Sequence, residues 1–177
     1  MTFTRFTEGA RKAVVAAGIH ALDAGRPALG AAPILLGLAE VQPFALKHFT
    51  ADPAGLRRLA GLPDPRELLA TLGIDLGEVH RRTRAGAEDP RRWSLRRSRV
   101  RPLRLTLYGP LGSLPLTPAA RKVVEVATSR PGLVTGERLL WGLLADGGNG
   151  ARRILRAAGV DVPALVREAA VPARRAA

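Results

Sequence analysis

The side chains that most often perform catalysis are few and scattered in this sequence. Its three histidines, His20, His48 and His80, lie far apart and lack the spacing of metal ligands. No serine has the sequence context of a hydrolase nucleophile; the four are Ser94, Ser98, Ser113 and Ser129. There is no cysteine, which excludes disulfides and thiolate chemistry, and no carboxylate pair suggests general acid–base work. We therefore expect no enzyme activity, no cofactor and no metal site.

Arginine is the functional side chain that the chain concentrates. Among its 28 basic residues 25 are arginine, and the net charge is +13. One stretch holds seven arginines and no acid: Arg91, Arg92, Arg96, Arg97, Arg99, Arg101 and Arg104. Guanidinium groups pair with phosphates and carboxylates, so acidic partners, nucleic acid included, are expected. Aromatic residues are only 4% of the chain, which leaves few stacking platforms for bases, and the run is equally typical of a solvated linker.

The elements that must position these residues include a helix start that occurs twice. Residues 6–17 read FTEGARKAVVAA and residues 116–127 read LTPAARKVVEVA, with six of twelve positions identical. ILLGL (34–38) matches LLWGL (139–143), and LLATLGID (68–75) matches ILRAAGVD (154–161). Three blocks in the same order indicate an internal duplication, and apolar residues at helical spacing indicate helices in both halves. Short helices are marginal alone, so the two halves are expected to pack together.

Boundaries follow from caps and breakers. The residues predicted to cap helices include Thr7, Asp52 and Thr117, and two further helices are predicted over residues 64–73 and 75–83. We expect a first repeat over residues 1–83, with extra residues around 41–63, and a second repeat over residues 114–171. Between them, residues 84–113 are predicted to form a basic, partly flexible linker, in which alternating leucines favour a short strand or an extended arm. Pro172 is expected to end the last helix, with a frayed tail over residues 172–177. The predicted fold class is all-α.

The order FTEGARK, LGAAPILLGL and LGID, then LTPAARK, VTGERLLWGL and AGVD, resembles the double Clp repeat. That repeat forms the N-terminal domain of Clp-family AAA+ unfoldases, and the ClpC kind is the most similar. The resemblance covers roughly residues 3–83 and 114–170 and implies two pseudo-symmetric four-helix repeats. It also implies docking of client proteins or adaptors for an unfoldase; some members bind phosphoarginine-tagged proteins or cyclic-peptide antibiotics.

The resemblance implies particular binding residues. Family members carry the motif GTEH before ILLGL, and its glutamate contacts phosphoarginine; this chain has Ala32 there in the first half and Glu137 in the second. Glu137 is equally explained as an acid at a helix start. The family's peptide-antibiotic surface corresponds to Phe3, Leu116 and Arg121, and Phe3 is equally consistent with ordinary core packing.

The function expected from these features is a non-catalytic protein- or peptide-binding module. It would act as an adaptor, decoy or peptide-antibiotic sponge, with Clp unfoldase or protease components, their clients or peptides as partners. The chain has no GxxxxGK phosphate loop of its own. The alternative is a nucleic-acid-binding regulator that uses the arginine run. No apolar stretch reaches the roughly 20 residues of a membrane span, and no signal peptide is apparent at the start, so a cytoplasmic location is expected.

Overall fold

The computed structural model describes residues 3–62, 86–98 and 104–175, and these combine helices with a small sheet. The longer helices are α1 (Glu8–Asp23), α2 (Ala31–Val41), α3 (Pro53–Leu59), α6 (Pro118–Thr128), α7 (Gly136–Ala145), α8 (Ala151–Ala157) and α9 (Val162–Arg175). Three strands, β1 (Ser94–Arg97), β2 (Leu105–Gly109) and β3 (Gly112–Pro115), form an antiparallel sheet in the order β1-β2-β3. The fold is therefore mixed α/β, and the all-α prediction is wrong.

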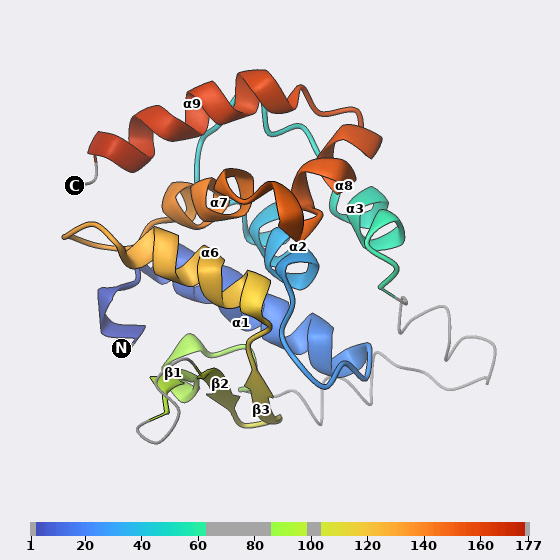
Figure 1. Ribbon diagram of the computed structural model, residues 1–177. Helices are drawn as coiled ribbons and strands as arrows, with labels where there is room; N and C mark the ends of the chain where they lie inside the picture. The colour runs from blue at the N-terminus through green and yellow to red at the C-terminus, as the bar shows by residue number, and fades with distance from the viewer. Residues whose placement is uncertain (1–2, 63–85, 99–103, 176–177) are drawn as a thin grey trace.

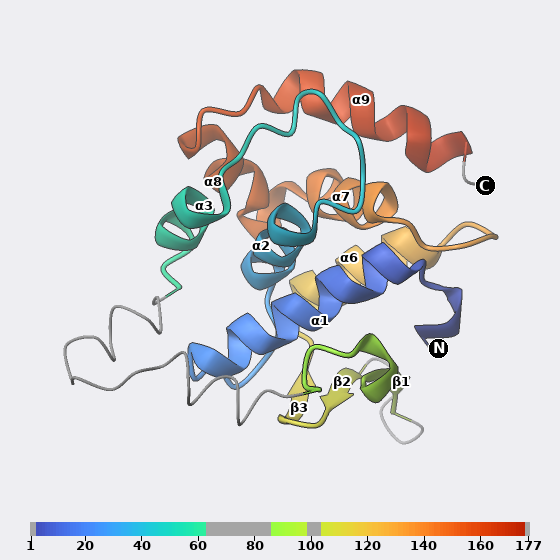
Figure 2. The same cartoon turned by 180° about the vertical axis from the view of Figure 1, so that it is seen from behind.

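The elements lie in layers (Figure 1). The sheet covers one side of α1, which lies together with α6 below α2 and α7, and α9 crosses the far side of α7. The view from behind shows the same order, with α3 and α8 together at one end of the helical layers (Figure 2). One hydrophobic core runs through these layers and joins residues of the helices and of the sheet.

The two duplicated helices begin in the same way. Thr7 precedes α1 and Thr117 precedes α6, both with extended backbone (φ −61°, ψ 159° and φ −62°, ψ 159°). Each threonine hydroxyl accepts a hydrogen bond from the backbone N–H three residues later, at 3.3 Å from Ala10 and 3.2 Å from Ala120. These caps satisfy N–H groups that the first helical turn leaves unpaired. The capping predicted from the repeated sequence is confirmed.

The two halves exchange backbone hydrogen bonds in a crossed pattern. Phe6, just before α1, forms a parallel bridge with Val134, just before α7; Leu116, just before α6, forms one with Leu29, just before α2. The Thr7 N–H donates to the Val134 carbonyl at 3.0 Å, and the Thr117 N–H donates to the Leu29 carbonyl at 2.9 Å. Each half therefore uses the other half's second helix to anchor the start of its own first helix.

The sheet is built from the segment predicted to be a partly flexible linker. Leu95, Leu105, Leu107 and Leu114 are at most 2% exposed and face the helices. A Cβ added at Gly18 would lie 2.7 Å from the Leu107 side chain, so α1 and β2 pack without space between them. This burial explains the strand, because alternate leucines need an apolar surface to cover them. The alternating leucines that favour a short strand lie in β2, which pairs with β1 and β3 in a sheet that packs on α1.

Trp93, directly before β1, fixes the sheet to the core. Its side chain is 3% exposed, and its indole N–H donates to the Ala87 carbonyl at 2.6 Å. The ring lies over Gly109, at a position where any side chain would collide with it. A tryptophan buried with its N–H satisfied contributes apolar area without leaving an unpaired donor.

Other predicted boundaries have mixed outcomes. Asp52 caps α3 through the Gly55 N–H at 2.8 Å, as the Asp-Pro sequence predicted. The prediction that the last helix ends at Pro172 is wrong, because α9 continues to Arg175. The predicted helices over 64–73 and 75–83 lie outside the described residues.

Candidate functional site

One pocket among the described residues lies between α1, α2 and the turn that leads to the sheet. Its volume is about 360 Å³, within the range of ligand-binding pockets. Its lining comprises Lys12, Val15, Ala16, Ile19, His20, Glu40, Val41 and Glu88. The five α1 residues follow one helical face at three- and four-residue spacing. The apolar members form the floor, and the charged members form the rim.

One wall of this pocket is a hydrogen-bonded group of three side chains. His20 Nε2 lies 2.6 Å from Glu40 Oε2, and an Arg57 Nη donates to Glu40 Oε1 at 2.9 Å. A second contact joins Arg57 to His20 Nδ1 at 3.3 Å. Arginine only donates, so in this arrangement Nδ1 accepts and Nε2 carries the hydrogen directed at Glu40.

The electrostatics of this wall favour an ionised carboxylate. Burial alone would raise the pKa of Glu40, but the hydrogen bonds and charges of His20 and Arg57 outweigh burial and lower that pKa below its usual value. Both carboxylate oxygens and both ring nitrogens are engaged by partners within the group. The group is therefore a fixed, polar wall, because each oxygen of Glu40 and each ring nitrogen of His20 already has a partner.

The rim carries charges of both signs. Lys12 Nζ lies 2.8 Å from Glu8 Oε1, one turn earlier on α1. This hydrogen bond and the charge of Lys12, with smaller contributions from Arg91 and Arg11, lower the pKa of Glu8 against a small effect of burial. Glu88 is exposed and forms no ion pair with any residue that the structure describes. Glu88 belongs to the segment between the two halves, so that segment completes the pocket.

This arrangement is suited to binding. None of the lining residues is a serine, threonine or cysteine, and the one histidine has both nitrogens occupied. Across the described ranges 3–62, 86–98 and 104–175, no group of three or more histidines and carboxylates is placed to hold a metal ion. The same residues include no helix long and apolar enough to cross a membrane. The floor can accept an aliphatic side chain, and Glu88 can pair with a cation beside it.

The structure does not assemble the antibiotic-type surface from the residues that the resemblance implied. Phe3 is only 6% exposed and packs edge-to-face on Phe6 at 5.3 Å between ring centroids. Leu116 is half-buried and belongs to the bridge with Leu29. Arg121 Nε lies 3.5 Å from Glu125 on the same face of α6. Phe3 therefore belongs to the core, while Leu116 and Arg121 lie at the other bridge.

The position expected to contact phosphoarginine lies at the start of α7. Glu137 is half-buried in the first helical turn, and Ala32 has the corresponding place in α2. The next residue, Arg138, is 2% exposed, and one of its Nη atoms donates to the Pro131 carbonyl at 3.0 Å. Burial, then the charges of Arg130 and Arg5, lowers the pKa of Arg138. Arg138 therefore holds the loop before α7 in place from within the core.

The arginines predicted to contact acidic partners point in different directions. Arg91 lies close enough to Glu8 to affect the titration of that carboxylate, and Arg92 lies over the turn at Gly86. Arg97 reaches Glu125 at 3.5 Å. Arg96 and Arg104 are exposed on or beside the sheet. Arg99 and Arg101 lie outside the described residues.

Sequence reasoning missed the α1–α2 pocket. No spacing in the sequence links His20 to its partners, because Glu40 and Arg57 are 20 and 37 residues away. One available signal was a histidine at a helix position otherwise continuing an apolar stripe, which requires polar partners when it is buried.

Comparison with known proteins adds no identification. The chain matches none of the family models and none of the curated proteins with which it was compared.

Proposed function

We propose that this chain is a non-catalytic module that binds an extended protein or peptide segment in the pocket between α1 and α2. The observation that carries the proposal is the composition of that pocket: an aliphatic floor of Val15, Ala16 and Ile19, a fixed polar wall, and Glu88 at the rim. A segment with an aliphatic side chain followed by lysine or arginine matches both features, because burial favours the first and Glu88 attracts the second.

The resemblance to Clp repeats supports a more specific role. In that family the domain docks clients and adaptors, so the proposed partners are a ClpC-type unfoldase, its clients or peptides. The crossed bridges between the halves support this relation, since they are what a duplicated repeat with pseudo-symmetry would produce. Adaptor, decoy and sponge roles all use the same pocket.

The test is fluorescence anisotropy with short labelled peptides that differ in two central positions: Leu-Lys, Leu-Glu, Ser-Lys and Ser-Glu. We expect Leu-Lys to bind most tightly. Ala16→Arg places a guanidinium over the floor and should weaken that binding at least about tenfold, the effect of roughly 1.4 kcal/mol. Ala157→Arg, the same change at an exposed position on α8, is the matched control.

Charge reversal at the rim distinguishes peptide binding in the pocket from non-specific binding. Glu88→Lys should reduce Leu-Lys binding and improve Leu-Glu binding. Equal binding of all four peptides, or equal losses of affinity in Ala16→Arg and Ala157→Arg, would refute the proposal that peptides bind in this pocket. Purified ClpC-type unfoldase, tested against the same variants, then decides whether the partner is the unfoldase or a client.

A further inference from the structure

The outer face of the sheet is a second polar surface, on the side away from the helices. The leucines of β1, β2 and β3 face α1, and strand alternation directs Arg96, Thr106, Tyr108 and Ser113 the other way. Tyr108 is 46% exposed. No aspartate or glutamate occurs in the three strands.

Register places two arginines and one tyrosine at neighbouring positions on this face. Arg96 pairs directly with Thr106, so Tyr108 is its diagonal neighbour on β2. The Arg96 guanidinium carbon lies 5.8 Å from the centre of the Tyr108 ring. Arg104 precedes β2 and is hydrogen-bonded through its carbonyl to the Ser98 N–H at 2.8 Å, which extends the pairing by one residue. Arg104 is therefore the diagonal neighbour of Arg96 on the other side.

We propose that Arg96, Arg104 and Tyr108 form a binding surface for single-stranded nucleic acid. Arginine forks bind phosphate oxygens, and an exposed tyrosine ring offers a face on which an unpaired base can stack. The net charge of +13 attracts polyanions to the whole molecule, whereas the tyrosine ring beside Arg96 distinguishes this face. An acidic protein surface would use the arginines without needing the ring.

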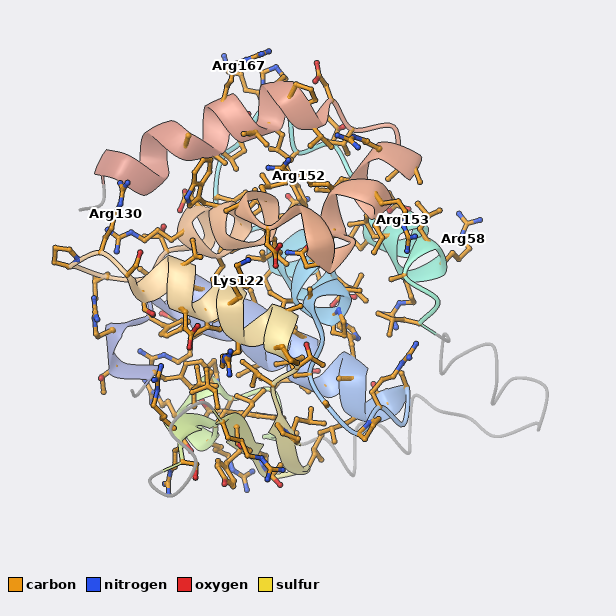
Figure 3. All side chains as sticks on the ribbon, in the orientation of Figure 1. Arg58, Lys122, Arg130, Arg152, Arg153 and Arg167 are labelled. Carbon is orange, nitrogen blue, oxygen red and sulfur yellow. The ribbon has the colours of Figure 1, made fainter. Side chains whose placement is uncertain are left out.

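Arginines elsewhere provide the comparison that the proposal needs. Arg167 on α9 and Arg153 on α8 are exposed and lie far from the sheet (Figure 3). They contribute to the same net charge, so a loss of binding that follows net charge alone would appear equally when Arg167 or Arg96 is replaced.

The experiment measures anisotropy of a labelled thymidine oligomer about 20 nucleotides long against salt concentration, with labelled heparin as a polyanion without bases. Tyr108→Ala should weaken oligomer binding roughly 5- to 160-fold, the range for one stacked base, and leave heparin binding unchanged. Tyr108→Phe keeps the stacking face and should bind like the parent protein. Arg96→Ser should weaken both probes and reduce the salt slope by about one contact, while Arg167→Ser should alter neither beyond twofold.

Three results would overturn the proposal. The first is an oligomer affinity unchanged in both Tyr108→Ala and Arg96→Ser. The second is an equal loss for heparin and the oligomer in Tyr108→Ala, which would indicate an acidic protein partner or damage to the sheet; thermal unfolding of Tyr108→Phe and Tyr108→Ala separates these. The third is binding of duplex as tight as that of the single strand, because paired bases offer no free face for the ring.

Discussion

Gly37 on α2 lies directly against the backbone carbonyl of Ala13 on α1, where a Cβ would overlap the oxygen and approach the Ala17 nitrogen to 2.9 Å. Gly142 on α7 has the same relationship with Val123 on α6, where a Cβ would lie 2.5 Å from the carbonyl oxygen. Both atoms that would be struck belong to backbone within helices, so neither can move aside without shifting a helix. The duplicated glycines therefore set the distance between the paired helices of each half.

Replacing these glycines should destabilise the fold through overpacking. We expect Gly37→Ala and Gly142→Ala each to lower the free energy of unfolding by about 1–3 kcal/mol, measured by urea denaturation. Gly55→Ala on α3 is the matched control, because its nearest contact would be Asp52 at 3.5 Å and alanine is the better helix former. A similar loss in all three variants would contradict this explanation.

The sheet should behave as part of the core. Trp93→Ala removes a buried ring that contacts α1 and Gly109, and we expect a loss of about 3–5 kcal/mol in unfolding free energy. Leu133→Ala removes an apolar side chain that is 55% exposed and should change stability by less than about 0.5 kcal/mol. If Trp93→Ala left the melting temperature unchanged, the sheet would not be part of the core.

Stability should fall in acid where Glu40 takes up a proton. The folded pKa of Glu40 is lowered from the ordinary value of 4.5, so its contribution is complete above that value and is lost as the pH falls through the lower, folded pKa. Glu40→Gln should therefore cost about 1 kcal/mol at neutral pH, with a difference from the parent that shrinks below pH 4.5. Denaturant midpoints measured from pH 3 to 7 test this, and a constant difference across that range would contradict it.

Glu168 holds the segment after α2 against α9. Its two oxygens accept from the Lys47 and His48 backbone N–H groups at 2.7 and 2.9 Å, and the His48 ring lies 2.9 Å away. Burial would raise the pKa of Glu168, but these backbone and ring hydrogen bonds outweigh it and lower that pKa. Glu168→Ala should speed hydrogen exchange at the two amides roughly tenfold or more. Arg167→Ala, at the neighbouring exposed residue, should leave both rates as they are.

The local part of the fold was predictable from the sequence. Thr7 and Thr117 cap their helices because a hydroxyl needs only the next turn of chain as a partner. The duplication located the paired helices, and Gly37 and Gly142 occupy equivalent places in the matching segments ILLGL and LLWGL. These features depend on contacts within one helix or between helices that follow each other directly in the chain.

The sequence predicted a short strand or an extended arm from the alternating leucines, but the three-stranded sheet and the pocket were not predictable, since both depend on contacts across the fold. Seven arginines suggested a solvated segment, yet Leu95, Leu105 and Leu107 are buried, because Gly18 leaves α1 open to Leu107. The pocket needs His20 and Glu40 on one side and Glu88 on the other, and no spacing in the sequence relates these three residues. For Phe3 the sequence left a binding role and core packing open; the side chain is 6% exposed and packs edge-to-face on Phe6.

The crossed bridges have a consequence for the origin of the chain. Phe6 with Val134 and Leu116 with Leu29 are one contact made twice, with the roles of the halves exchanged. A single ancestral half could make both contacts only with a second copy of itself, in an isologous homodimer with two-fold symmetry. Gene fusion would have made that association independent of concentration. It would also have freed the two copies to diverge, so that the joining segment could become a sheet and bring Glu88 to the pocket of one half.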